Sequence, residues 1–326
     1  MPERFEVERA AHGLRVRNHQ LYLEPHGRPP LGFVAHARRA HPILPERTVA
    51  TAATVALLEA GQPRALRKAA ALPAALKKSF ALGSLRLTLH AAGHVLGSAQ
   101  IRCEADDLDL VYSGDLGQGS LTAEPREVLN CEEGTFVLRA TYGHPRYVFP
   151  PRAQALEKVR AFVEKTLAAR ATPLLDASAV GATQDLLRAL GDRYRLRLHP
   201  TALRACEVYR SQGISLPAAS ALEGEGEIVV VPPTARLGRL SIGPHRTCVL
   251  SGHAIDATRG AGADEAIALS DHLGFLDLVA VAVESGARRI LTTHTHAEAL
   301  ASALRDKGLD ARAIGQQHHQ LPLPGF

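Results

Sequence analysis

Short apolar segments with strand-like composition alternate with segments of helical periodicity along most of the chain. This alternation predicts an α/β protein with a parallel sheet. Residues before position 140 are strand-rich, with strands predicted at 21–24, 32–36, 85–90, 99–104, 108–113 and 135–140 and one helix at 52–60. After the proline-containing segment 147–151, strands at 172–177, 194–198, 228–231, 247–250, 266–269, 288–293 and 311–314 alternate with helices at 152–171, 183–190, 201–212, 275–285 and 297–307.

Composition narrows the class of protein. The chain has 326 residues, of which 46% are hydrophobic and 22% charged, as in an ordinary globular protein. It has no apolar run of the length that a membrane helix needs, and its charged first residues do not resemble a signal peptide. Four scattered cysteines without a CxxC pair argue against a zinc ribbon or a disulfide framework, so we expect a cytoplasmic protein. The net charge of +5 weakly favours an anionic partner such as nucleic acid.

Histidine and aspartate residues follow several of the predicted strands. The segments are Phe33–His41, Ala92–Ser98, Tyr112–Gly117, Leu269–His272 and Leu291–His296. A loop that follows a strand is held rigidly, so metal ligands and catalytic groups are often found there. Read singly, these histidines are ordinary loop residues, and His94 and Asp115 can be explained by loop hydrogen bonds alone.

Four motifs together point to a known family. AAGHVLGSAQI followed by VYSGDLG, ATYGHPRYVFPP, SDHLGF and TTHTHAEAL resemble the motifs of the metallo-β-lactamase fold in its β-CASP nuclease branch, and within it the bacterial DNA-ligase-associated exonucleases. The resemblance runs from Gly13 to Ile314 and implies an αββα sandwich with an inserted β-CASP-like α/β cap domain. It divides the chain into the first part of the metallo-β-lactamase domain at 1–150, the cap at 151–245, and the second part with the C-terminal tail at 246–326. In that family two zinc ions activate a water molecule that cuts a phosphodiester.

The resemblance also implies roles for single residues. The metal ligands that remain are His36, His41, His94, Asp115 and His294. His272 falls on the histidine that assists proton transfer, and Asp271 and Glu24 fall on supporting positions.

Three positions depart from the family pattern: Arg38 replaces a histidine ligand, Ala40 replaces an aspartate, and Arg139 replaces an acid. An arginine is always protonated and only donates hydrogen bonds, so we expect Arg38 to pair with Asp115 and take the place of the missing cation. Loss of two acids removes the usual means of orienting and deprotonating water. The sequence therefore predicts a site with no metal or one weakly bound ion, zinc if any.

Three functions remain open at this point. The favoured one is a catalytically impaired nuclease homologue that binds nucleic acid, or a partner such as a DNA ligase, a helicase or a nuclease, through a groove lined by Arg38 and Arg139. The second is an active metal-dependent nuclease that keeps a reduced zinc site, with His272 as acid or base. One metal ion would then be held either by His36, His94 and Asp115 or by His41, Asp115 and His294. A non-nuclease hydrolase of the same fold is the third. The sequence decides neither whether the protein is an enzyme nor its oligomeric state, and the arginine-rich stretches at 15–17, 38–39, 193–197 and 288–289 are expected to be solvated faces.

Overall fold

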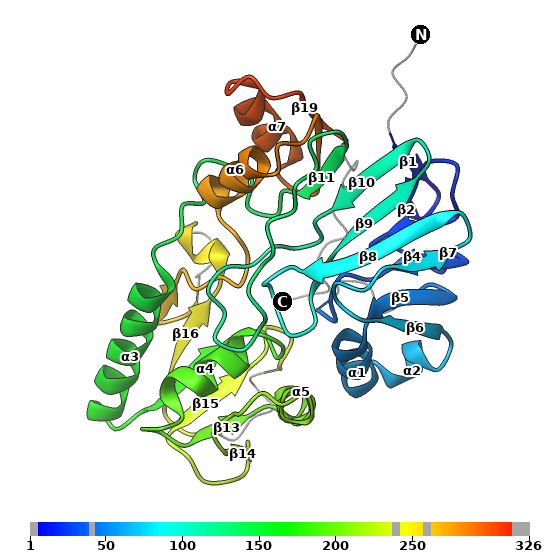
Figure 1. The fold of residues 1–326 in the computed structure, drawn as a ribbon. Coiled ribbons are helices and arrows are strands. Elements are labelled where there is room, and N and C mark those ends of the chain that lie inside the picture. The colour runs from blue at the N-terminus through cyan, green and yellow to red at the C-terminus, as the bar shows by residue number, and fades with distance from the viewer. Residues whose placement is uncertain (1–5, 39–42, 237–241, 257–261, 315–326) are drawn as a thin grey trace.

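The computed structural model describes residues 6–38, 43–236, 242–256 and 262–314, which form a mixed α/β architecture with three sheets (Figure 1). The first sheet keeps the chain order. Its strands are β1 (Val7–Ala10), β2 (Gly13–Val16), β3 (Tyr22–Leu23), β4 (Leu31–Phe33), β5 (Arg47–Thr51) and β6 (Ala70–Ala74). Strands β1 to β3 pair antiparallel and β3 to β6 pair parallel, with α1 (Ala52–Gly61) and α2 (Pro63–Leu66) in the connection from β5 to β6.

The second sheet joins two distant parts of the chain. Its order is β19-β18-β11-β10-β9-β8-β7. The strands are β7 (Phe80–Leu82), β8 (Leu85–Ala91), β9 (Ala99–Ala105), β10 (Leu108–Tyr112), β11 (Thr135–Arg139), β18 (Arg289–Thr293) and β19 (Ala311–Ala313). The parallel pair of β11 with β18 sets Arg139 opposite Thr293, so residues from both parts of the chain meet at the carboxyl ends of these strands.

The third sheet lies apart from the other two in Figure 1 and is parallel throughout. Its order is β14 (Ala219–Ala221), β13 (Leu196–Leu198), β15 (Ile228–Val231), β12 (Thr172–Asp176), β16 (His245–Leu250) and β17 (Glu265–Ile267). The helices α3 (Arg152–Ala168), α4 (Ala182–Leu190) and α5 (Pro200–Ser211) alternate with its strands, and a 3₁₀ turn, η2 (Gly252–Ile255), follows β16. This is the βαβ pattern expected from the sequence.

Three apolar clusters hold these layers together. One contains Leu23 and Phe33 of the first sheet with Leu89 and Ile101 of the second, so the two sheets pack face to face. Another packs α6 (Phe275–Glu284) and α7 (Ala297–Arg305) against the second sheet. The largest joins α1 to the helices and strands of the third sheet. The loops that carry the candidate site are therefore held between packed layers.

The predicted strands and helices correspond to described elements within a few residues, but several strands were not expected from the sequence. These are β1, β2, β5, β6, β7 and β14. The strand β6 contains Pro73, which is tolerated because β6 lies at the edge of its sheet. The division of the chain at residues 150 and 245 stays a prediction; β16 and β17, which follow that second boundary, pair in the third sheet.

No helix in the described part of the chain has both the length and the apolar character needed to cross a bilayer. All four cysteines are buried, and none forms a disulfide.

Candidate functional site

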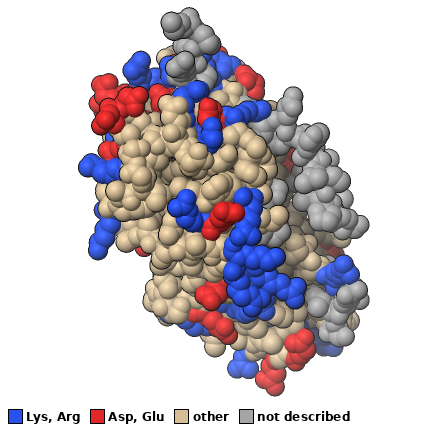
Figure 2. Space-filling model, turned by 90° about the vertical axis from the view of Figure 1, so that its right-hand side faces the viewer, with Lys and Arg blue, Asp and Glu red and all other residues tan. Residues whose placement is uncertain are grey.

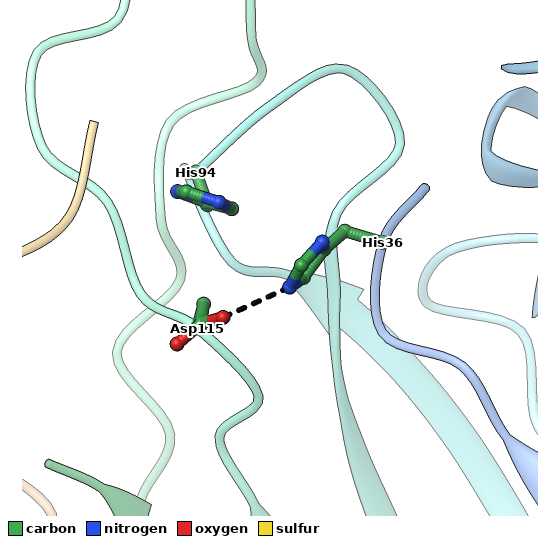
Figure 3. A group of neighbouring side chains, drawn as sticks. All are labelled: His36, His94 and Asp115. Atoms are coloured by element: carbon green, nitrogen blue, oxygen red, sulfur yellow. Dashed lines mark hydrogen bonds and ion pairs between the residues drawn. The ribbon is translucent and has the colours of Figure 1, made fainter. Parts of the chain in front are cut away.

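His36, His94 and Asp115 meet in one buried cluster (Figure 3). Each stands three residues beyond the end of a strand: β4, β8 and β10 respectively. Their candidate ligand atoms all lie within 4.8 Å of one another, and Nε2 of His36 lies 2.9 Å from Oδ2 of Asp115. Within the described residues this is the one cluster whose donor atoms are suited to a metal ion.

The loop that carries His94 is fixed by local hydrogen bonds. The backbone N–H groups of His94 and Val95 donate to Oγ of Ser98 at 3.0 and 3.1 Å. The hydroxyls of Thr51 and Thr54, at the start of α1, donate to the carbonyl of Gly97 at 2.7 and 2.9 Å. Hydrogen bonds within the loop and from the start of α1 thus hold the loop in place. They fix the position of the His94 imidazole.

The loop that carries Asp115 depends on a close backbone approach. A Cβ at Gly117 would lie 2.3 Å from the carbonyl oxygen of Gly93, 2.5 Å from Cα of His94 and 2.6 Å from the carbonyl oxygen of Asp271. Only glycine fits at this point, where three segments of the site come together.

His94 is oriented by a backbone carbonyl. Its Nδ1 lies 3.1 Å from the carbonyl oxygen of Asp271 and therefore carries the proton, which leaves Nε2 as an acceptor. Burial holds the pKa of His94 well below its usual value, and the positive charge of Arg38 lowers it further. Its Nε2 is buried without a hydrogen-bond partner among the described residues, as is Nδ1 of His36. A histidine that ligates a metal ion typically has one ring nitrogen held by a hydrogen bond, as Nδ1 of His94 is here, and the other nitrogen open to the ion.

Asp115 is already surrounded by donors. Its Oδ1 accepts from Oγ1 of Thr141 at 2.8 Å and lies 2.9 Å from Nε of Arg139 and 3.6 Å from Nδ1 of His272. Burial alone would raise the pKa of Asp115, but Arg139 first and then His272 outweigh it and hold the pKa well below its usual value. The carboxylate is therefore ionised and paired within the protein.

Arg139 takes the position that was expected for Arg38. It ends β11, where its Nη1 also lies 3.9 Å from Oε2 of Glu24. Burial would lower the pKa of its guanidinium, but Asp115, followed by Tyr112 and Glu24, raises it above its ordinary value. Glu24 in turn accepts a hydrogen bond from the backbone N–H of Ala35, beside His36.

The expected pair of Arg38 with Asp115 is wrong. Nη1 of Arg38 donates to Oδ2 of Asp271 at 2.6 Å, and Nη2 lies 2.8 Å from Nε2 of His272. The physical reason is that the end of β11 sets Arg139 beside Asp115, whereas Arg38 reaches across to the loop after β17. Since a guanidinium only donates, Nε2 of His272 must accept and the imidazole is neutral. Burial, the largest influence, also lowers the pKa of His272.

The charge network continues into the segment predicted as a cap. Arg152, at the start of α3, donates to the carbonyl of Ser270 at 2.9 Å and lies 3.2 Å from Oδ1 of Asp271. It also pairs with Asp185 of α4, which is buried and accepts from Oγ1 of Thr122 at 2.6 Å. Sequence reasoning missed Arg152 and Asp185, because neither belongs to a motif and a single charge on a helix is ordinarily solvated.

The charges of the site are compensated. Arg38, Arg139 and Arg152 face the carboxylates of Asp115, Asp271, Asp185 and Glu24. The groove that we expected Arg38 and Arg139 to line for a phosphate therefore lacks an excess of positive charge from these arginines.

His294, another predicted ligand, does not belong to the buried cluster of His36, His94 and Asp115. It follows β18 with a positive φ of 80°, and its Nδ1 lies 3.0 Å from Oγ1 of Thr295. Ala40 and His41 fall outside the described residues. The alternative ligand set of His41, Asp115 and His294 thus stays a prediction.

Sequence similarity to a known protein extends over most of the chain. No family model matches the chain. The chain is 33% identical over 319 residues to a protein of Opitutus terrae named probable DNA ligase, an alignment that covers 94% of this chain and 31% of that protein. The chain therefore spans about a third of the length of this relative.

Shorter regions match archaeal proteins. The RNase J-like protein of Methanocaldococcus jannaschii is 26% identical over 113 residues, which is 34% of this chain and 27% of that protein. The transcription termination factor FttA of Methanococcus maripaludis is 28% identical over 114 residues, which is 34% of this chain and 18% of that protein. These relatives fit the resemblance to the metallo-β-lactamase/β-CASP nuclease branch that the four motifs carry.

Proposed function

We propose that this protein is a catalytically impaired homologue of β-CASP nucleases that binds nucleic acid in the cytoplasm. In this proposal the first two sheets with their helices form the αββα sandwich, from residues 1–150 and the part of 246–326 that follows β17. The third sheet forms the cap, with β12 to β15 inside 151–245 and with β16, which begins at residue 245, and β17 added from the residues after it. The observation that carries the proposal is the ion pair of Arg139 with Asp115, which supplies the positive charge that the carboxylate would otherwise take from a metal ion.

Electrostatics supports this proposal over a two-zinc site. A divalent cation and a guanidinium about 4 Å apart repel by about 8 kcal/mol at an effective dielectric near 20. Arg139 is largely buried and held by both Asp115 and Glu24, so it cannot easily move out of the way. Arg38 covers Nε2 of His272, so this histidine is not available for proton transfer in the arrangement described. Arg139 thus disfavours metal binding, and Arg38 disfavours acid–base catalysis by His272.

A second candidate is an active nuclease with a single metal ion held by His36, His94 and Asp115. The observation that favours it is the buried, unpartnered Nε2 of His94, whose ring is oriented through Nδ1 in the manner of a metal ligand. Three protein ligands are sufficient for a catalytic zinc ion. Such an ion would polarise a phosphoryl oxygen and lower the pKa of a bound water.

Metal analysis and a nuclease assay separate the two candidates. Protein purified without a histidine tag is expected to contain far less than one equivalent of metal and to leave single-stranded substrates intact with added Zn²⁺ or Mn²⁺. Stoichiometric zinc, with cleavage lost in His94→Ala and kept in the exposed control His245→Ala, would instead establish the second candidate.

Partner binding is a further part of the proposal. The relative named probable DNA ligase suggests a DNA ligase as the partner class, in preference to a helicase or another nuclease. Salt-sensitive binding of the chain to single strands tests the nucleic-acid part, because each phosphate contact adds to the dependence of affinity on salt.

A further inference from the structure

A long part of the chain carries only positive charge. All seven side chains among Asp, Glu, Lys and Arg in residues 60–103 are basic: Arg64, Arg67, Lys68, Lys77, Lys78, Arg86 and Arg102. The first three lie in and just after α2, and all three are exposed. This concentration is unusual in a chain whose net charge is only +5.

Two of these basic residues, Arg64 and Lys68, line an open cavity of about 560 Å³, which we call the basic pocket. Its charged walls are Arg28, Arg64 and Lys68, and its apolar walls include Ile43 and Leu44. Nη2 of Arg28 donates to the backbone carbonyl of Lys68, which ties the loop before β4 to the end of α2. Figure 2 shows a continuous area of Lys and Arg on the side of the molecule that carries the first sheet, α1 and α2.

The only acid paired with this pocket in the described residues is Glu46, whose carboxylate lies 3.9 Å from Nε of Arg28. Arg64 and Lys68 have no ion pair among these residues. Their charge thus differs from that of Arg38, Arg139 and Arg152, which is compensated. The basic pocket is the better place for an anion.

The basic pocket is connected to the candidate site through α1. The first turn of α1 holds the His94 loop through Thr51 and Thr54, and its last residue, Gly61, lines the pocket. Ten helical residues rise about 15 Å, so α1 spans the distance between the pocket and the His94 loop. On the far side Arg204 of α5 donates to the carbonyl of Ala60 at 3.1 Å, so the third-sheet region also borders the end of α1.

We propose that the basic pocket binds the sugar–phosphate backbone of a nucleic acid strand whose continuation runs along α1 towards the His94 loop. This inference rests on the proposed nucleic-acid binding and assigns it to a surface outside the His36, His94 and Asp115 cluster. Arg28 and Arg64 suit phosphate oxygens because a guanidinium presents paired donors, and Lys68 adds a point charge. The apolar wall at Ile43, which is 51% exposed, offers a surface for a sugar or a base.

Fluorescence anisotropy with the full chain tests this proposal. The probes are fluorescein-labelled oligothymidine and oligouridine of 20 nucleotides, titrated at several salt concentrations between 50 and 200 mM. The variant Arg64→Gln/Lys68→Gln removes two exposed charges, and Lys158→Gln/Lys307→Gln removes two exposed charges elsewhere. Circular dichroism and thermal unfolding of both variants verify that they are folded.

We expect the pocket variant to bind at least tenfold more weakly at 50 mM salt, with a slope of log K against log salt reduced by about 1.4, and the control to match the wild type. Equal loss in both variants, or no loss in the pocket variant, would overturn the assignment of the pocket while leaving nucleic-acid binding intact. A wild-type chain that binds neither probe would overturn the proposed function and the pocket together.

Discussion

Nε of Arg139 lies 2.9 Å from Oδ1 of Asp115, at a position where the family resemblance implies an acid. Compared with the family pattern, a fixed positive charge replaces one carboxylate and lies next to Asp115, which the resemblance assigns as a metal ligand. Because both side chains are largely buried, the charge of each depends on the other.

Reversing the charge of Arg139 is expected to make the stability of the protein depend on a bound metal ion, because the carboxylates of the site lose the guanidinium that now balances their charge. In Arg139→Glu, Asp115 and Glu24 lose their buried partner and gain a third acid, which should lower the free energy of unfolding by about 3 to 5 kcal/mol in EDTA. Added Zn²⁺ should restore part of this loss by binding only the folded state. Thermal unfolding with EDTA and with Zn²⁺ measures both effects.

The matched control is Arg86→Glu, an exposed position paired with Glu104 at 3.3 Å. It should change stability little and show no response to Zn²⁺. If Arg139→Glu behaved in the same way as this control, the pairing of Arg139 with Asp115 would not contribute to the site as we describe.

Stability should fall as the pH drops from 7 to 5.5. The pKa values of His94 and His272 are lowered in the folded protein, mainly by burial, so the unfolded chain binds protons more readily below about pH 6.5. The contribution of the two histidines to the free energy of unfolding is therefore fully present above pH 6.5 and is lost as the pH falls towards their folded pKa values. At pH 5.5 the loss should be about 1 to 3 kcal/mol in total. Urea unfolding at each pH measures it, and His94→Gln should flatten the dependence; an unchanged slope would contradict the assignment.

Asp271 is expected to couple the candidate site to α3. Asp271→Asn leaves Arg38 and Arg152 without their shared carboxylate, and we expect a loss of about 2 to 4 kcal/mol in the free energy of unfolding. Chemical unfolding compared with the exposed control Asp107→Asn tests this, since the control should differ from the wild type by less than about 0.5 kcal/mol. A variant as stable as that control would show that the two arginines find other partners.

Gly117→Ala should disturb the site directly. Its Cβ would meet backbone atoms of Gly93, His94 and Asp271 within 2.6 Å, so the three loops must separate, at a cost of about 1 to 3 kcal/mol or more. Gly61→Ala is the control, because a Cβ there meets nothing within 4 Å. Thermal unfolding of the two variants compares them, and equal melting temperatures would mean that the close approach at Gly117 is not required.

Most elements could be predicted because their residues follow a clear period. The helix α3 was expected from Leu156, Val159, Val163 and Leu167, of which the first three are buried. The strand β6 was missed because Ala70–Ala74 has no strong strand formers and contains a proline; its structure depends on pairing with β5. Tertiary pairing of this kind has no local signature in the sequence.

The site could be predicted only in part. The motifs correctly brought His36, His94 and Asp115 together, since each follows a strand of one packed pair of sheets. They did not predict which arginine would face which carboxylate. That choice depends on the direction in which each loop leaves its sheet, and a motif does not encode it. Arg139 therefore faces Asp115 where Arg38 was expected, and Arg38 pairs with Asp271.

The hydrogen bonds of the His94 loop also determine at which stage of synthesis and folding the candidate site can form. The N–H of Leu96 donates to Oη of Tyr209, 113 positions later, and Nδ1 of His94 bonds to the carbonyl of Asp271, 177 positions later. On a ribosome, the loop emerges long before either partner exists. Its final geometry is thus a late folding event with a high entropic cost of closure, and a chain interrupted before Asp271 would carry every histidine of the buried cluster without the arrangement that defines it.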